Sequence, residues 1–164
     1  MSHLIEDWRH RKNAVLKKKP KWLPKLRQHR GKPLNRWANE LDTAVFNEID
    51  CLDCANCCTS IPPIVTNNDA ERLAAHLRIS STDFFDQYLQ KDEDGDIVIN
   101  QSPCPFLQED NKCSVYEYRP KACRQYPHTG TNDFSKYLEL HFQNSVYCPA
   151  VFHLLERMDK AGAF

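Results

Sequence analysis

The stretch CLDCANCC, residues 51 to 58, places four cysteines within eight positions of a 164-residue chain. Two residues separate Cys51 from Cys54 and Cys54 from Cys57, and Cys58 follows directly. A C-x2-C turn brings two thiolates to one metal and directs backbone N–H groups at them. The spacing therefore predicts metal binding, and it disfavours the plainer interpretation that these are ordinary buried cysteines.

The adjacent cysteines at the end of this stretch carry separate information. Consecutive side chains point about 100° apart around a helix and to opposite faces of a strand. Cys57 and Cys58 therefore do not easily serve one mononuclear ion, and we expect either two centres or one ligand beside one packed thiol. Eight cysteines are enough for two tetrathiolate sites. The candidate metal ligands are Cys51, Cys54, Cys57, Cys58, Cys104, Cys113, Cys123 and Cys148.

The first three cysteines of the stretch match the start of the ferredoxin pattern C-x2-C-x2-C-x3-C-P. The match stops at the fourth ligand, because position 61 is Ile61. A fourth ligand must then come from farther along, and the Cys-Pro pairs that begin at Cys104 and Cys148 are candidates. The triplet favours a 4Fe-4S cluster and the missing nearby ligand favours zinc. Thiolate ligation accepts both.

Other residues near the later cysteines fit an anionic metal centre. Lys112, Arg119, Lys121 and Arg124 lie close to Cys113 or Cys123 in the sequence and could offset the charge of thiolates, although a solvated basic surface is the alternative. Among the seven histidines, His128 is the candidate for a further ligand, while His76, His141 and His153 are expected to pack or to lie at the surface. No local signature identifies a catalytic nucleophile.

At this point the sequence resembles a known family. CLDCANCC, the segment PCPFLQEDNKCSVYEYRPKACRQYP and the final CPAVFHLL are similar to the YkgJ-type cysteine cluster family of CxxCxxCC zinc- or iron-chelating proteins. The resemblance runs from about Cys51 to Cys148 and implies a metal cofactor held by these cysteines. Flagellin lysine N-methylases contain a similar domain, but this chain shows no S-adenosylmethionine site.

Charge divides the chain unevenly although its formal net charge is zero. Residues 1–40 hold 12 lysines and arginines against three acids, together with all three tryptophans, Trp8, Trp22 and Trp37. We interpret 1–40 as a basic N-terminal arm and 41–164 as the cysteine-cluster domain. Basic residues among aromatics suit RNA, but packing of the arm on the acidic remainder is the favoured interpretation.

Periodicity predicts a mainly α, irregular, small metal-stapled single domain. Helices are expected at 4–16, 35–50, 66–77, 80–89, 121–126 and after Pro149, with a short strand at 97–99 and an ambiguous segment at 134–147. The acidic segment 92–96 is expected to form a hairpin turn rather than a calcium loop.

Composition and the absence of particular motifs narrow the possible functions. Four glycines cannot form a phosphate-binding loop, which disfavours nucleotide enzymes. The N-terminus offers no apolar leader and no apolar run is long enough to cross a bilayer, so the expectation is a cytoplasmic protein with reduced thiols and no membrane association. Three functions remain open: a metal-binding protein, a ferredoxin-like electron-transfer component with an unknown redox or protein partner, and a zinc-stapled module that binds nucleic acid. Whether the protein is an enzyme is uncertain.

Overall fold

The computed structural model describes residues 2–17 and 31–161, without the side chains of residues 15–17. The described part is mainly helical with one small sheet, as predicted from the sequence. It divides into two compact units, the first formed by residues 1–54 and 127–164 and the second by residues 55–126. Trp22 lies outside the described residues.

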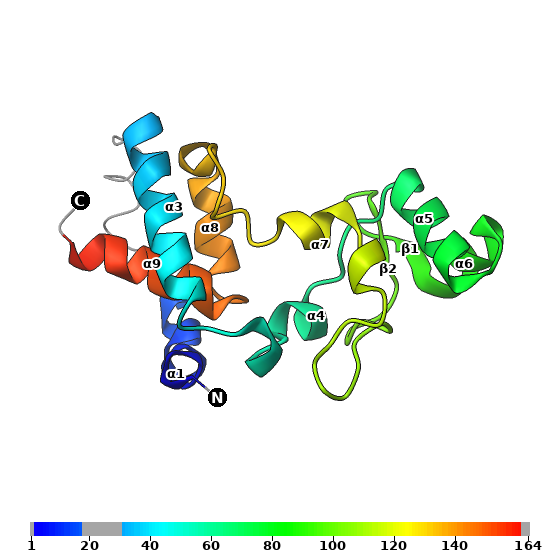
Figure 1. The fold of residues 1–164 in the computed structure, drawn as a ribbon, viewed down its shortest axis with the longest axis horizontal. Helices are drawn as coiled ribbons and strands as arrows, with labels where there is room; N and C mark the ends of the chain where they lie inside the picture. The colour runs from blue at the N-terminus through cyan, green and yellow to red at the C-terminus, as the bar shows by residue number, and fades with distance from the viewer. Residues whose placement is uncertain (1, 18–30, 162–164) are drawn as a thin grey trace. The chain divides into compact units, whose positions relative to one another are not determined.

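The first unit is built around its C-terminal helix, α9 (Pro149–Lys160). This helix packs against α1 (His3–Lys17), α3 (Lys32–Phe46) and α8 (Leu138–Asn144), as Figure 1 shows. Pro149 starts α9 well because its missing N–H is not needed in the first turn. The core includes Ile5, Ala38, Val45, Phe142, Val151, Leu154 and Met158, each at most 7% exposed.

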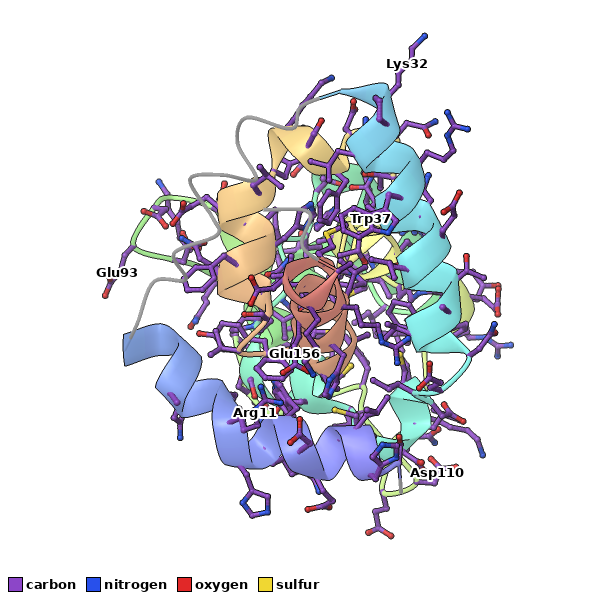
Figure 2. The ribbon with its side chains drawn as sticks, turned by 90° about the vertical axis from the view of Figure 1, so that its left-hand side faces the viewer. Arg11, Lys32, Trp37, Glu93, Asp110 and Glu156 are labelled. Carbon is purple, nitrogen blue, oxygen red and sulfur yellow. The ribbon has the colours of Figure 1, made fainter. Side chains whose placement is uncertain are left out.

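The N-terminal helix is part of this core. Ile5 is fully buried and Trp8 is 1% exposed. The indole N–H of Trp8 donates a hydrogen bond of 2.8 Å to the carbonyl oxygen of Ser145. Trp37 on α3 packs partly buried against the same core and is labelled in Figure 2. Two of the three tryptophans thus fill space in the first unit.

The ambiguous segment 134–147 is helical. A short 3-10 helix at Phe134–Lys136 precedes α8, and Phe134 and Leu138 are buried in the first-unit core. The buried side of α8 includes a histidine: His141 is fully buried and stacks on Phe134, with ring centroids 4.2 Å apart.

The second unit contains two capped helices and a hairpin. Thr66 and Asp69 form the predicted capping box of α5 (Asn67–Leu77). Ser80 caps α6 (Ser81–Tyr88) by accepting a hydrogen bond from the Asp83 N–H. Strands β1 (Leu89–Lys91) and β2 (Ile97–Ile99) pair antiparallel with Leu89 opposite Ile99.

The acidic segment between the strands is the expected hairpin turn. The Asp92 carboxylate accepts the backbone N–H groups of Asp94 and Asp96, and Gly95 has a φ of 91°. Only a residue without a side chain adopts this left-handed backbone readily. The chain then continues through two short helical pieces, Tyr116–Tyr118 and α7 (Lys121–Gln125), the latter beginning directly after Pro120 as expected.

Candidate metal centres

The second unit brings together four cysteines that lie far apart in the sequence. Cys58 lies on α4 (Asn56–Ser60), Cys104 and Cys113 on irregular segments and Cys123 on α7. Each is half-buried, and all eight cysteines of the chain are free thiols. We call these four the second-unit thiols.

Backbone hydrogen bonds fix three of the second-unit thiols relative to one another. The N–H of Cys104 donates to the carbonyl oxygen of Cys58 at 2.8 Å. Leu107 and Cys113 form a β-bridge, and the N–H of Ser114 donates to the carbonyl oxygen of Phe106 at 2.8 Å. These bonds close a tight loop that carries Cys104 and Cys113.

Backbone N–H groups also point at the sulfurs. The N–H groups of Phe106 and Leu107, two and three residues after Cys104, act on its sulfur, and that of Val115 acts on Cys113. Such donors stabilise the thiolate and lower its pKa. The turns after these cysteines therefore have the donor arrangement that a thiolate ligand needs.

Electrostatic coupling shows that the second-unit thiols form one group. Burial is the largest cause that raises the pKa of Cys123 to about 12, and the charges of Cys58, Cys104 and Cys113 raise it further. Burial likewise raises the pKa of Cys104 and of Cys113, with contributions from Cys58. Without a cation these groups stay protonated as thiols, and a bound metal would supply the positive charge that four thiolates need.

The adjacent pair behaves differently from the remaining thiols. The sulfurs of Cys57 and Cys58 lie 4.0 Å apart, and this contact with Cys57 is the largest cause that raises the pKa of Cys58. By sequence spacing Cys57 forms a C-x2-C turn with Cys54.

The first unit holds a second group of thiols, Cys51, Cys54 and Cys148. Cys51 begins a 3-10 turn, Cys51–Asp53, and its carbonyl oxygen accepts the N–H of Cys54 at 3.1 Å. Burial raises the pKa of Cys148 to about 12, and the charges of Cys51 and Cys54 add to the shift. These three are the first-unit thiols.

Cys148 occupies the N-cap position of α9. The N–H groups of Ala150 and Val151, two and three residues on, act on its sulfur and oppose the effect of burial on its pKa. The positive end of a twelve-residue helix also favours a thiolate there. Of the two Cys-Pro candidates for a fourth ferredoxin-like ligand, Cys148-Pro149 is the one that lies in the same unit as Cys51 and Cys54.

Cys51 is the exposed member of the first-unit thiols. It lines an open hollow of about 750 Å³ together with Ser2, Asp53 and residues 46–50. Beside it, the Asp50 carboxylate accepts the N–H of Leu52 at 2.9 Å and holds the turn. This hollow gives solvent a route to the first-unit thiols.

The predicted basic neighbours take different roles. The Arg119 guanidinium lowers the pKa of Cys113 and Cys123 against the larger effect of burial, and it lies 3.7 Å from the ring centroid of Tyr116. Lys112 instead pairs with Asp110 at 2.6 Å at the surface. Arg124 donates to the carbonyl oxygen of Arg119 at 2.5 Å. Of these side chains, Arg119 is the one that offsets thiolate charge.

Three of the four histidines considered in the sequence analysis belong to the first unit. His128, the candidate ligand, belongs to the first unit, where burial lowers its pKa. His76 stacks on Tyr118 with ring centroids 4.0 Å apart, and His141 is buried against Phe134. His76 lies in the second unit, and His128, His141 and His153 lie in the first.

One further group of potential ligands occurs in the described residues, where Asp7, His153 and Glu156 bring three ligand atoms within 4.8 Å of one another. Arg11 already pairs with Asp7 at 2.7 Å and with Glu156, and Figure 2 shows Arg11 and Glu156 side by side. Lys160 adds a contact of 3.2 Å to Glu156. We interpret this group as an ion-pair network.

The helical fold and the two groups of thiols are the features with which known proteins can be compared. A family described as "CxxCxxCC: Putative zinc- or iron-chelating domain" matches residues 50–149, and the chain belongs to this family. An uncharacterized protein of Methanocaldococcus jannaschii is 29% identical over 82 residues, 48% of this chain and 44% of the relative, so the match covers less than half of that protein. No solved structure matches the chain. Within the described residues, no helix is long and apolar enough to span a membrane.

Sequence spacing did not reveal how the sulfurs are held. The sequence indicates the N–H donors after Cys104, Cys113 and Cys148 only weakly, through the fact that each cysteine precedes a turn or the start of a helix. The sequence does not indicate the role of Asp69 beyond its capping box, because the Lys121 N–H that it binds lies 52 positions away.

Proposed function

We propose that the protein holds two iron-sulfur centres. One would use the second-unit thiols, Cys58, Cys104, Cys113 and Cys123. The other would use the first-unit thiols, Cys51, Cys54 and Cys148. The observation that carries the proposal is that backbone N–H groups two or three residues on act on the sulfurs of Cys104, Cys113 and Cys148.

The spacing of the sulfurs supports a cluster rather than a single ion. Zinc binds thiolates at about 2.3 Å, which puts tetrahedral sulfurs roughly 3.8 Å apart. Within each unit, no three of the described cysteine sulfurs lie mutually within 4.8 Å. A four-iron cluster has its thiolates farther apart and so suits the wider groups.

The ferredoxin pattern gives independent support. Its fourth ligand is a cysteine followed by proline. Cys148-Pro149 meets this description, and the charges of Cys51 and Cys54 act on Cys148. We therefore propose Cys148 as the distant cysteine that takes the place of the ligand missing near residue 61.

The protein's own residues would protect and tune such centres. Half-burial of the thiols limits access of water, the N–H donors lower thiolate basicity and Arg119 offsets negative charge at Cys113 and Cys123. Bound iron-sulfur clusters supply one-electron transfer. A ferredoxin-like role with a redox partner follows from this proposal.

Metal and acid-labile sulfide analysis of protein purified without oxygen tests the identity of the centres. We expect iron and sulfide in equal amounts and a visible absorption band that dithionite bleaches. Zinc without sulfide would overturn the iron-sulfur assignment and leave the chain as a zinc-stapled protein.

Two further expectations remain proposals. Binding of RNA by residues 1–40 has less support, because Trp8 is buried and hydrogen-bonded rather than available for stacking. A salt-titrated RNA-binding assay with no detectable affinity would remove it. Cytoplasmic location is supported by the eight free thiols, which persist in a reducing compartment.

A further inference from the structure

A buried carboxylate lies at the centre of the second unit. Asp69 is 2% exposed, yet it is charged and it begins a helix. Its carboxylate accepts the Thr66 hydroxyl at 2.7 Å and the Arg72 guanidinium at 2.6 Å. Burial alone would raise the pKa of this carboxyl, but its hydrogen bonds outweigh burial and hold the pKa below the ordinary value.

One of these hydrogen bonds reaches far along the chain. The backbone N–H of Lys121 donates to Asp69 Oδ1 at 3.1 Å, across 52 positions. Lys121 is the first residue of α7, and the N–H groups of a helix's first turn have no partner within the helix. Asp69 thus caps two helices at once, its own and the five-residue helix that carries Cys123.

Arg72 extends the same link to the segment before α7. Its Nη2 atom donates to the carbonyl oxygens of Tyr118 at 3.2 Å and Arg119 at 3.0 Å. Arg124 approaches Asp69 Oδ1 at 3.9 Å from within α7. The pair Asp69–Arg72 therefore holds both ends of the turn that leads from Arg119 into the helix.

A helix of five residues is not stable without such support, because nucleation is unfavourable and few internal bonds form. Its position must come from tertiary contacts. Cys123 follows Lys121 by two residues, so the contact that fixes the start of α7 also fixes this sulfur relative to Cys58, Cys104 and Cys113.

We propose that Asp69, through Arg72 and the Lys121 N–H, is the positioning residue that holds Cys123 in the second-unit thiols. This inference rests on the proposed function, since it concerns one ligand of the proposed centre. Capping of α5 needs only Thr66 and a carboxylate in the same turn, and it does not account for a buried charge that also binds Arg72 and the Lys121 N–H of α7.

Cysteine alkylation under native conditions tests the proposal. Wild-type protein and the variants Asp69→Asn, Arg72→Ala and Arg72→Lys are purified without oxygen, treated with iodoacetamide and mapped by peptide mass spectrometry. Arg72 is one-third exposed, so its replacement is compatible with folding. Asp42→Asn is the matched control, because Asp42 is a carboxylate of the first unit that accepts the Thr129 hydroxyl at 2.5 Å.

We expect Cys123 to react at least about tenfold faster in Asp69→Asn and Arg72→Ala, as when outer partners of metal ligands are removed. In Arg72→Lys the alkylation rate of Cys123 should lie between the rates in these variants and in wild type, because lysine keeps the positive charge but lacks the guanidinium fork. Cys51, Cys54 and Cys148 should keep their wild-type rates in all three variants. Asp42→Asn should lower thermal stability without accelerating Cys123.

Two results would overturn the inference. One is a wild-type rate at Cys123 in both Asp69→Asn and Arg72→Ala. The other is an equal acceleration of all eight cysteines, which would mean general destabilisation. Either can occur while the wild-type protein retains its metal, so failure of the inference is distinct from failure of the proposed function. A metal-free wild type whose Cys123 reacts like a free thiol would overturn both.

Discussion

The backbone N–H of Cys104 donates a hydrogen bond of 2.8 Å to the carbonyl oxygen of Cys58. This bond joins the last cysteine of the CLDCANCC stretch to a cysteine 46 positions later. It shows how a local motif becomes part of a three-dimensional group, because the backbone of Cys58 is bonded to that of Cys104 while its sulfur lies 4.0 Å from that of Cys57. The neighbouring Cys57 keeps the C-x2-C spacing from Cys54.

The two adjacent cysteines should have different effects when replaced. In Cys58→Ser the second-unit thiols lose one ligand, so we expect loss of about half of the bound metal and faster alkylation of Cys104, Cys113 and Cys123. In Cys57→Ser those three thiols should stay protected. Metal analysis and alkylation mapping measure both effects, and identical patterns in the two variants would refute separate centres.

Trp8 should be important for stability rather than for binding. Its side chain is 1% exposed and its indole N–H is bonded to Ser145. Trp8→Ala should lower the free energy of unfolding by about 3–5 kcal/mol, the usual cost of removing a buried tryptophan. Urea denaturation measures this change, with Trp8→Phe as a milder control. A loss below about 1 kcal/mol would show that the first helix does not pack as described.

His141 should make the first unit sensitive to acid. Its ring is fully buried against Phe134, and burial lowers its pKa from 6.5 to about 4. Between these values the unfolded chain binds a proton that the folded chain does not, so stability falls as the pH falls from 6.5 to 4. The loss amounts to about 3 kcal/mol over this range.

His141→Phe provides the test of this pH dependence. The phenyl ring keeps the stacking on Phe134 and removes both buried nitrogens, which lack a hydrogen-bond partner in the described part of the chain. We expect the variant to have a higher free energy of unfolding than wild type at pH 5, and we expect this difference to be smaller at pH 7.5. The comparison uses wild type at each pH, because protonation of thiolates affects both proteins alike. An unchanged difference between pH 7.5 and pH 5 would contradict a neutral buried histidine.

Much of the fold could be predicted from local chemistry. The cap residues Thr66 and Ser80, the start of α9 after Pro149 and the strand at 97–99 all lie where the sequence placed them. These features depend on contacts within a few residues, which a sequence displays directly. The C-x2-C spacing of Cys51, Cys54 and Cys57 is likewise a local property that the sequence displays directly.

The grouping of the thiols could not be predicted in this way. Which Cys-Pro pair joins Cys51 and Cys54 depends on how the chain returns to the first unit at residue 127. The short strand β1 was missed because Leu89–Lys91 continues a helical pattern, and its pairing with β2 decides its structure. The importance of Asp69 was hidden because its capping role already explained it.

Native mass spectrometry of protein purified without oxygen tests the central claim most directly. Wild-type chain should carry two mass increments, each of four irons and four sulfides. Cys123→Ser and Cys148→Ser should each lose one increment and keep the other. A single increment that both variants abolish, or zinc ions in place of clusters, would contradict two iron-sulfur centres held by separate groups of thiols.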